Sequence, residues 1–157
     1  MLSDLDSHPR LNLAIDGASE ADPTLNLVDG EGVCKKFIAI VDENKMVVNL
    51  GGGGLALLVE VMPFYWKFKV ERLEGMFEFA ECVPRLRTDN VKVAGMLYVT
   101  DNENYIVDLY LERELGDLNV ASDKTLRLPG VVEHGMFLGL ATTLIVTGEL
   151  DVCVNNK

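Results

Sequence analysis

Positive charge is scarce in this sequence, and its scarcity argues against whole classes of partner. The 157 residues carry 14 Lys and Arg against 25 Asp and Glu, which gives a formal net charge of −11. Nucleic acids and anionic membrane surfaces attract basic patches, so neither is expected as a partner. A small phosphorylated ligand stays possible if local lysines or backbone N–H groups bind its phosphate against the overall field.

Residues that ligate metals are also few. The sequence has three cysteines, Cys34, Cys82 and Cys153, and two histidines, His8 and His134. They form no CxxC, HxH or HxxxH pattern, so we expect no metal site. An odd number of widely spaced cysteines predicts reduced thiols, as in a cytosolic type of compartment.

Patterns of targeting and membrane insertion are missing as well. Residues 1–6 are acidic and lack the apolar core of a secretory signal, and they are not Arg- and Ser-rich like a transit peptide. No apolar run approaches the length that spans a membrane. We therefore expect a cytoplasmic protein, with a plastid location left open.

Two apolar runs near the start of the chain predict a parallel sheet. Residues 11–16 and 37–41 read as strands, and each ends at an acid, Asp16 or Asp42. Open α/β sheets bind ligands beyond the carboxyl ends of their strands, which makes Asp16 a candidate site residue. A parallel pair needs a crossover, usually a helix. Residues 20–36 show no helical period, so the expected crossover helix is missing.

The central part of the chain predicts a different architecture. Its expected elements are a strand at 57–61, a helix from Pro63 to about Leu73, strands at 83–87 and 104–111, a helix at 118–128 and a strand at 131–137. Phe64, Tyr65, Phe68 and Leu73 recur at helical spacing, and together with Trp66 they are expected to form the core side of the first helix. The order βαββαβ is that of the ferredoxin-like fold.

The whole chain is therefore predicted to combine α/β with α+β structure. Short strands at 142–146 and 151–154 are expected to return to the first sheet. We predict a partial α/β domain, residues 1–50 completed by 139–157, and a ferredoxin-like domain, residues 55–138. The glycines at 51–54 favour a hinge between the two over a phosphate loop, because a β-rich segment follows them instead of a helix.

Residue types alone leave the function open. Asp16, Glu20 and Asp22 follow the first strand and favour a solvated acidic turn, and Lys45 reads as a surface lysine. His134 lies in an apolar strand, where a structural histidine is more common than a catalytic base.

Three motifs, in this order, carry a resemblance to a known family. They are AIDGASE at residues 14–20, VTDNENYIVDL at 99–109 and VVEHGMFLGLA at 131–141. Together they resemble type A ribose-5-phosphate isomerases, particularly those of plants, over most of the chain from about His8. The resemblance implies a remnant of the family's parallel Rossmann-like sheet with a ferredoxin-like lid domain. It places the family's N-terminal phosphate loop before residue 1.

The resemblance also assigns site residues. Asp16 matches the first of two active-site aspartates, followed by the expected Gly17, and Lys45 matches a lysine that lines the substrate site. Ser19 stands where the family has the second aspartate, and Asp29 replaces a substrate-binding lysine. The family's general base is a glutamate on a helix that has no counterpart here.

The activity implied by the resemblance is the interconversion of ribose 5-phosphate and ribulose 5-phosphate through an enediolate, without a metal or organic cofactor. It belongs to the pentose phosphate pathway and the Calvin cycle of carbon fixation. Because the base-bearing helix is missing, we expect this truncated copy to be nearly inactive by itself. Two alternatives remain: a non-catalytic protein that associates with itself or with full-length isomerase subunits, and a gene-model product without a stable fold.

Overall fold

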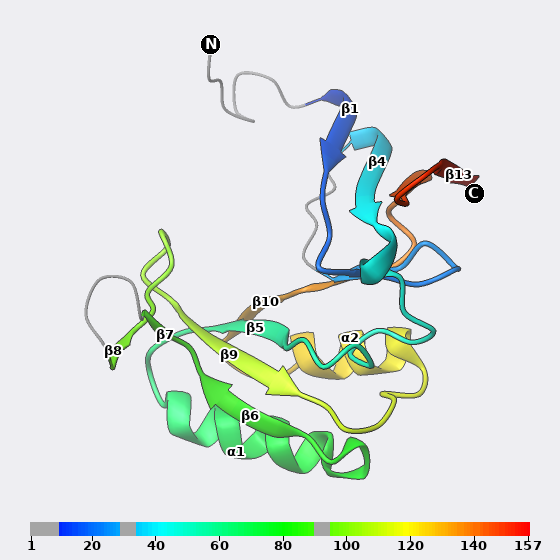
Figure 1. Ribbon diagram of the computed structural model, residues 1–157. Coiled ribbons are helices and arrows are strands. Elements are labelled where there is room, and N and C mark those ends of the chain that lie inside the picture. Colours follow the sequence, from blue (N-terminus) through cyan, green and yellow to red (C-terminus); the bar gives the residue numbers. More distant parts are fainter. Residues whose placement is uncertain (1–9, 29–33, 90–94) are drawn as a thin grey trace. The chain divides into compact units, whose positions relative to one another are not determined.

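A computed structural model describes residues 10–28, 34–89 and 95–157, and it divides the chain into two compact units. Unit 1 comprises Met1–Val48 and Phe137–Lys157, and unit 2 comprises Asn49–Met136. The expectations at residues 1–6, His8 and Asp29 lie outside the described residues. The fold is α/β with mixed sheets, as the sequence predicts (Figure 1).

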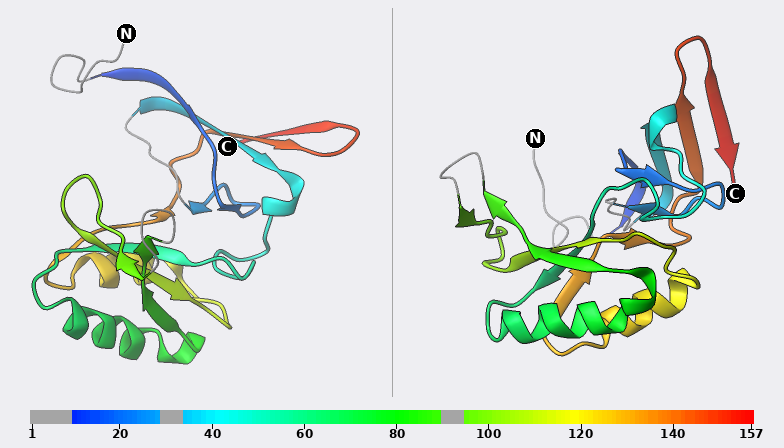
Figure 2. Two further views of the ribbon diagram at one scale, coloured as in Figure 1. Left: turned by 60° about the vertical axis from the view of Figure 1, so that its left-hand side comes forward. Right: turned by 60° about the horizontal axis from the view of Figure 1, so that its bottom comes forward.

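The main sheet of unit 1 is largely parallel. It has the order β1-β4-β12-β13 and consists of β1 (Leu11–Asp16), β4 (Cys34–Asp42), β12 (Thr143–Thr147) and β13 (Val152–Asn156). The first three strands run parallel, and β13 turns back against β12 as an antiparallel edge (Figure 2). Both runs predicted as strands near the start of the chain are therefore strands, and they are neighbours in this sheet.

A short hairpin occupies the connection between β1 and β4. It consists of β2 (Glu20–Ala21) and β3 (Leu27–Val28), and β11 (Met136–Phe137) joins β3 in a small sheet of order β11-β3-β2. In the described part of this connection, residues 17–28, there is no helix. The hairpin provides apolar side chains in place of one: Ala21, Leu25 and Leu27 pack with Phe37, Ala39, Val41, Ala141 and Leu144 into the core of unit 1.

Unit 2 is built on an antiparallel sheet of order β10-β5-β9-β6. Its elements are β5 (Leu57–Val61), α1 (Trp66–Met76), the 3-10 turn η2 (Glu78–Ala80), β6 (Val83–Leu86), β9 (Tyr105–Tyr110), α2 (Leu118–Leu126) and β10 (Val131–His134). A small ribbon of β7 (Thr88–Asp89) and β8 (Met96–Leu97) is attached to it. The sheet order is 4-1-3-2 in chain order of its own strands, as the ferredoxin-like fold requires. Both helices lie on one face of the sheet (Figures 1 and 2).

The first helix of unit 2 differs from its prediction. Tyr65 adopts a left-handed backbone with φ 56°, so α1 begins at Trp66 rather than near Pro63. Phe64, Tyr65 and Phe68 are exposed by 71%, 71% and 56%, so the expectation that they form the core side of the helix was wrong, whereas Leu73 is fully buried as expected. Phe64 and Tyr65 precede the helix, and within it the buried side chains are Lys69 and Leu73, one turn apart, so Phe68 lies off the inward side.

Lys69 takes the inward position instead. Its side chain is buried, and its ammonium donates hydrogen bonds to the carbonyl oxygens of Met62 and Phe64. Removal from water lowers the pKa of this ammonium below its ordinary value. The inward lysine thus provides donors to two backbone carbonyls that precede the helix.

Candidate functional site

The candidate site begins at the carboxyl ends of the parallel strands of unit 1. Asp16 is the last residue of β1 and pairs with Ala39 in β4. Its side chain is exposed, and its Oδ1 accepts a hydrogen bond of 2.8 Å from the N–H of Gly17. This bond orients the carboxylate, while Oδ2 has no hydrogen-bond partner in the described part of the chain. Gly17 has ordinary space for a side chain, since an added Cβ would lie 3.8 Å from the Ile40 carbonyl oxygen.

Lys45 lies at the same edge of the sheet, beyond β4. Asp42 ends that strand and caps a short 3-10 helix, η1 (Glu43–Lys45), by accepting a 3.1 Å hydrogen bond from the N–H of Asn44. Lys45 is the last residue of this turn and is half-buried. Among the described residues, no ion pair or hydrogen bond links it to Asp16. From Ala39, the partner of Asp16, to Asp42 the chain advances roughly 10 Å at the usual strand rise.

Further acids lie near this lysine. Gly148 follows β12, and a Cβ added to it would lie 3.0 Å from a carboxylate oxygen of Glu43 and 3.0 Å from one of Asp151. Sequence reasoning did not single out these acids, because only the pairing of β12 with β4 brings the turn after β12 to this edge. An anion bound at this edge would therefore be attracted by Lys45 and backbone N–H groups and repelled by several carboxylates.

The acids after Asp16 do not form a solvated turn, and that expectation was wrong for two of them. Glu20 is 2% exposed and Asp22 is 6% exposed. Asp22 accepts hydrogen bonds from the N–H and hydroxyl of Thr24, both 2.8 Å, and from the N–H and side-chain amide of Asn26, 3.0 and 2.9 Å. All these bonds stay within the β2–β3 hairpin, so Asp22 stabilises the turn and is not available to a ligand. Ser19 begins the hairpin, and its N–H donates to the carbonyl of Val28.

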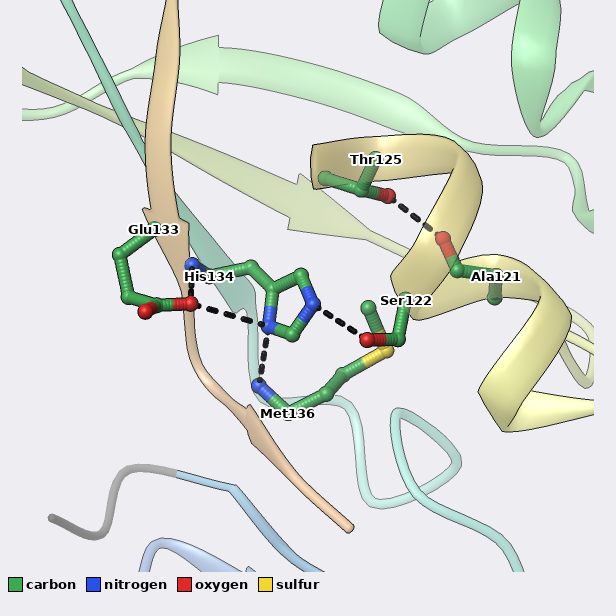
Figure 3. Close-up of polar contacts among 6 residues, drawn as sticks. All are labelled: Ala121, Ser122, Thr125, Glu133, His134 and Met136. Carbon is green, nitrogen blue, oxygen red and sulfur yellow. Dashed lines mark hydrogen bonds and ion pairs between the residues drawn. The ribbon is translucent and has the colours of Figure 1, made fainter. Parts of the chain in front are cut away.

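His134 is part of a buried hydrogen-bond group in unit 2 (Figure 3). Its Nδ1 accepts from the N–H of Met136 at 3.2 Å, which leaves the proton of a neutral ring on Nε2. Nε2 lies 2.7 Å from the hydroxyl oxygen of Ser122 and donates to it in this tautomer. A ring that donates to the serine cannot accept its proton, so the pair is structural and ties β10 to α2.

The glycine segment before β5 does not form a phosphate loop. Gly51 is buried with φ +81°, and a Cβ added there would contact the Leu111 side chain. The next regular element is a strand, β5, so no helix N-terminus faces the glycines. The close packing of Gly51 against Leu111 explains why glycine is needed at this position.

Two open hollows are formed by residues other than those of the carboxyl edge. One, of about 430 Å³, is lined by Pro23–Leu25 and residues 154–157. The other, of about 600 Å³, lies beside α1 and is lined by Glu71, Glu74, Glu78 and Glu81. Neither contains Asp16, Gly17 or Lys45, and the four glutamates of the second would repel a phosphate.

The described residues include no group of three or more His, Cys, Asp or Glu side chains placed to hold a metal ion. None of the helices found in them has both the length and the apolar composition needed to cross a bilayer.

Comparison with known proteins decides the family. A model of the family "Ribose 5-phosphate isomerase A (phosphoriboisomerase A)" matches residues 1–151. The chain belongs to this family. Two Arabidopsis thaliana relatives, probable ribose-5-phosphate isomerases 1 and 2, are 55% and 52% identical to it over 99% of the chain. The chain spans 63% and 62% of their respective lengths.

Solved members of the isomerase A family share the fold. The ribose 5-phosphate isomerase of Plasmodium falciparum is 28% identical with a TM-score of 0.85, and the match covers 96% of this chain and 67% of that one. A D-ribose-5-phosphate isomerase in complex with phospho-erythronic acid is 29% identical, also with a TM-score of 0.85, over 99% of this chain and 69% of that one. The expected family and its fold are thus confirmed.

Proposed function

We propose that this chain belongs to a sugar-phosphate isomerase whose substrate is ribose 5-phosphate or ribulose 5-phosphate, bound at the carboxyl edge of the β1–β4 sheet. The observation that carries the proposal is that Asp16 and Lys45 follow neighbouring parallel strands at one edge of the sheet. The chain that holds them belongs to the isomerase A family. A solved relative is described in complex with phospho-erythronic acid, a four-carbon sugar acid phosphate. Such a compound resembles the open-chain, doubly oxygenated end of an enediolate.

Each proposed site residue has a role that its surroundings support. The Oδ1 atom of Asp16 is held by the Gly17 N–H, so Oδ2 is the atom that would accept a hydroxyl proton of the sugar. The ammonium of Lys45 would face the phosphate or the negative oxygen of the enediolate. In a chain with net charge −11, this lysine opposes an otherwise repulsive field.

The isomerisation needs a base that removes a proton from one carbon and returns it to the next. The resemblance assigns that base to a glutamate on a helix after Gly32, whereas this sequence passes from Gly32 to β4 within a few residues, too few for such a helix. We therefore propose that the chain by itself binds the sugar phosphate weakly. Its turnover would be lower by about 10²- to 10⁴-fold for the missing base alone. The missing base favours a second role for the chain, as a subunit that associates with complete isomerase subunits.

Calorimetric titration with ribose 5-phosphate tests the proposed site. Lys45→Met and Asp16→Asn should each weaken binding at least about tenfold, equivalent to about 1.4 kcal/mol. Lys67→Met is the matched control, because it removes a lysine from the exposed side of α1 and changes the net charge by the same amount. If the control weakens binding as much as Lys45→Met, binding is a non-specific charge effect and the site proposal fails.

A second titration tests the residues that depart from the family. The double change Ser19→Asp and Asp29→Lys should tighten binding of ribose 5-phosphate without producing measurable turnover. Turnover by the unaltered chain within about tenfold of 1–10³ s⁻¹ would contradict the proposed loss of the base. Turnover that appears only after mixing with a full-length plant isomerase, beyond that isomerase's own rate, would support the subunit role.

We infer that the protein resides in the cytosol, because an odd number of widely spaced cysteines predicts reduced thiols. A plastid is the alternative, because one relative, 46% identical, is named chloroplastic. Fluorescent fusions to the chain in plant cells would separate the two.

A further inference from the structure

A group of hydrogen bonds surrounds His134 at the carboxyl end of β10 (Figure 3). The imidazole is 4% exposed, and both of its nitrogens have partners. Nδ1 accepts from the N–H of Met136 at 3.2 Å, and Nε2 lies 2.7 Å from the hydroxyl oxygen of Ser122 in α2. One side chain thus joins β10 both to α2 and to Met136, the first residue of β11.

The Nδ1 atom of His134 has two possible partners, and its protonation decides between them. Without a proton it accepts the N–H of Met136. With a proton it is a donor, so two N–H groups face each other over 3.2 Å and the bond to Met136 is lost. The acceptor at hand is the carboxylate of Glu133, whose Oε1 lies 3.8 Å from Nδ1 and already accepts from the backbone N–H of His134 at 2.9 Å. A modest rotation of the Glu133 side chain would bring it within hydrogen-bond distance of the protonated ring.

The charges around the ring favour this exchange of partners. The elements packed against β10 are β5 and α2. Glu60 in β5 is the register partner of Glu133, so two carboxylates lie opposite each other on neighbouring strands. A positive imidazolium beside Glu133 would offset part of their repulsion. In α2, the charged neighbours of Ser122 are Asp123 and Lys124, which are exposed and opposite in sign, so their net effect on the ring is small.

We propose that His134 is a pH-dependent switch: its neutral ring holds the first residue of β11, whereas its protonated ring releases that residue and binds Glu133. The holding bond is complete where the ring is neutral and is lost as pH falls through the range in which imidazoles titrate, between about pH 8 and 5. Met136 is 4% exposed, so its released N–H lacks a water partner unless this end of β11 opens. Acidification should therefore loosen β11 locally.

The switch acts on the small sheet of order β11-β3-β2. Release of β11 would leave one side of β3 without its backbone partner. On its other side, the carbonyl of Val28 in β3 accepts from the N–H of Ser19, which follows Asp16 by three positions. The switch is independent of the proposed sugar-phosphate function, because its hydrogen bonds are made within the fold without a ligand.

Amide hydrogen exchange of the full chain, followed by NMR between about pH 7.5 and 5.5, is the test. After correction for the intrinsic effect of pH on exchange, protection of the Met136 N–H should fall at least about tenfold as the ring signals of His134 titrate. Val107 lies in β9 between β5 and β6, and its protection should change by less than about twofold. An equal loss of protection at both positions would be global acid unfolding and would contradict a local switch.

Three variants separate the switch from a purely structural role of the ring. His134→Asn offers Met136 a neutral carbonyl oxygen near the place of Nδ1, so protection should no longer depend on pH, although the bond to Ser122 is lost. Glu133→Gln removes the carboxylate that binds the charged ring and should move the loss of protection to lower pH. His8→Asn, the matched control, removes the other histidine of the chain and should behave like the unaltered protein.

Circular dichroism reports whether the variants are folded, and Glu133→Gln carries the test alone if His134→Asn unfolds. Protection of Met136 that is the same at both ends of the pH range would overturn the proposal. So would an equal fall in His134→Asn and the unaltered chain, or an unchanged midpoint of the fall in Glu133→Gln.

Discussion

At the scale of single residues, similar side chains have opposite roles according to their contacts. Asp16 and Asp22 lie six positions apart, yet Asp16 is exposed at a strand end and Asp22 is buried with four hydrogen bonds. Proximity in sequence to a candidate site residue therefore does not make an acid part of the site.

Removing Asp22 should destabilise unit 1. Asp22→Ala leaves the donors of Thr24 and Asn26 without their acceptor, which we expect to lower the free energy of unfolding by about 2–3 kcal/mol. Asp101→Ala, at an exposed acid in a turn of unit 2, should change it by less than about 0.5 kcal/mol. Urea unfolding of both variants checks this. Equal effects would show that the hydrogen bonds of Asp22 contribute little.

Because of Cys82, we expect the stability of the chain to depend on pH in the alkaline range. Burial first, and the nearby Glu74 carboxylate second, raise the pKa of this thiol from an ordinary 9.0 to about 11. Between these values the unfolded chain has lost a proton that the folded chain keeps, so the free energy of unfolding falls as pH rises. The contribution of the protonated Cys82 thiol to the free energy of unfolding is complete below about pH 9 and is lost by about pH 11. Its magnitude is on the order of 2 kcal/mol.

The test is the slope of stability against pH. Cys82→Ala should flatten the fall between pH 9 and 11 relative to the unaltered chain, because no thiol then ionises on unfolding at that position. Cys153→Ala, which removes an exposed thiol, should keep the original slope. A slope unchanged in Cys82→Ala would contradict the assignment.

At the scale of elements, turns decide where helices and strands begin. α2 begins after Asp117, whose Oδ1 accepts from the N–H groups of Asn119 and Val120 at 2.9 and 3.2 Å. The predicted strand at 131–137 is divided at Gly135, because β10 pairs with β5 whereas β11 pairs with β3 in the small sheet. α2 and β10 are connected by a tight turn at Gly130, with φ +82°.

Gly130 should tolerate alanine poorly, for a reason beyond its backbone. A Cβ at this position would contact Lys69 and lie 2.6 Å from its Nζ, which displaces the ammonium from the carbonyls it binds. Gly116 also has positive φ, +72°, but nothing lies within 4 Å of its added Cβ. Both alanine variants carry the left-handed backbone penalty of about 1–2 kcal/mol.

The difference between the two variants therefore isolates the contact with Lys69. We expect Gly130→Ala to lower the free energy of unfolding by at least about 1 kcal/mol more than Gly116→Ala, as measured by urea unfolding. Equal losses would mean that Lys69 moves aside without cost.

At the scale of the whole molecule, the two units should differ in local stability. Val107 and Leu109 are fully buried in β9, between β5 and β6, whereas Leu13 is 49% exposed in the edge strand β1. Hydrogen exchange should therefore be slowest in β9 and much faster in β1. Faster exchange in β9 than in β1 would show that unit 1 is the more stable part.

The sequence by itself determined the family and most of the elements. Periodic apolar runs and turn residues are local signals, so the strands at 11–16 and 57–61 could be predicted, and the helix predicted at 118–128 is observed at Leu118–Leu126. The motifs around Asp16 and His134 identified the isomerase A family. The prediction for the inward side of α1 was wrong for Phe64 and Tyr65 because the left-handed Tyr65 places both before the helix, and for Phe68 because Lys69 and Leu73 take the inward positions.

Only the tertiary structure decided which of these residues share an environment. Pairing of β12 with β4 brings Gly148 and its neighbouring acids to the edge that carries Lys45, although about a hundred positions separate them in sequence. Strand pairing between distant segments depends on which apolar faces pack together, and no local pattern contains that information.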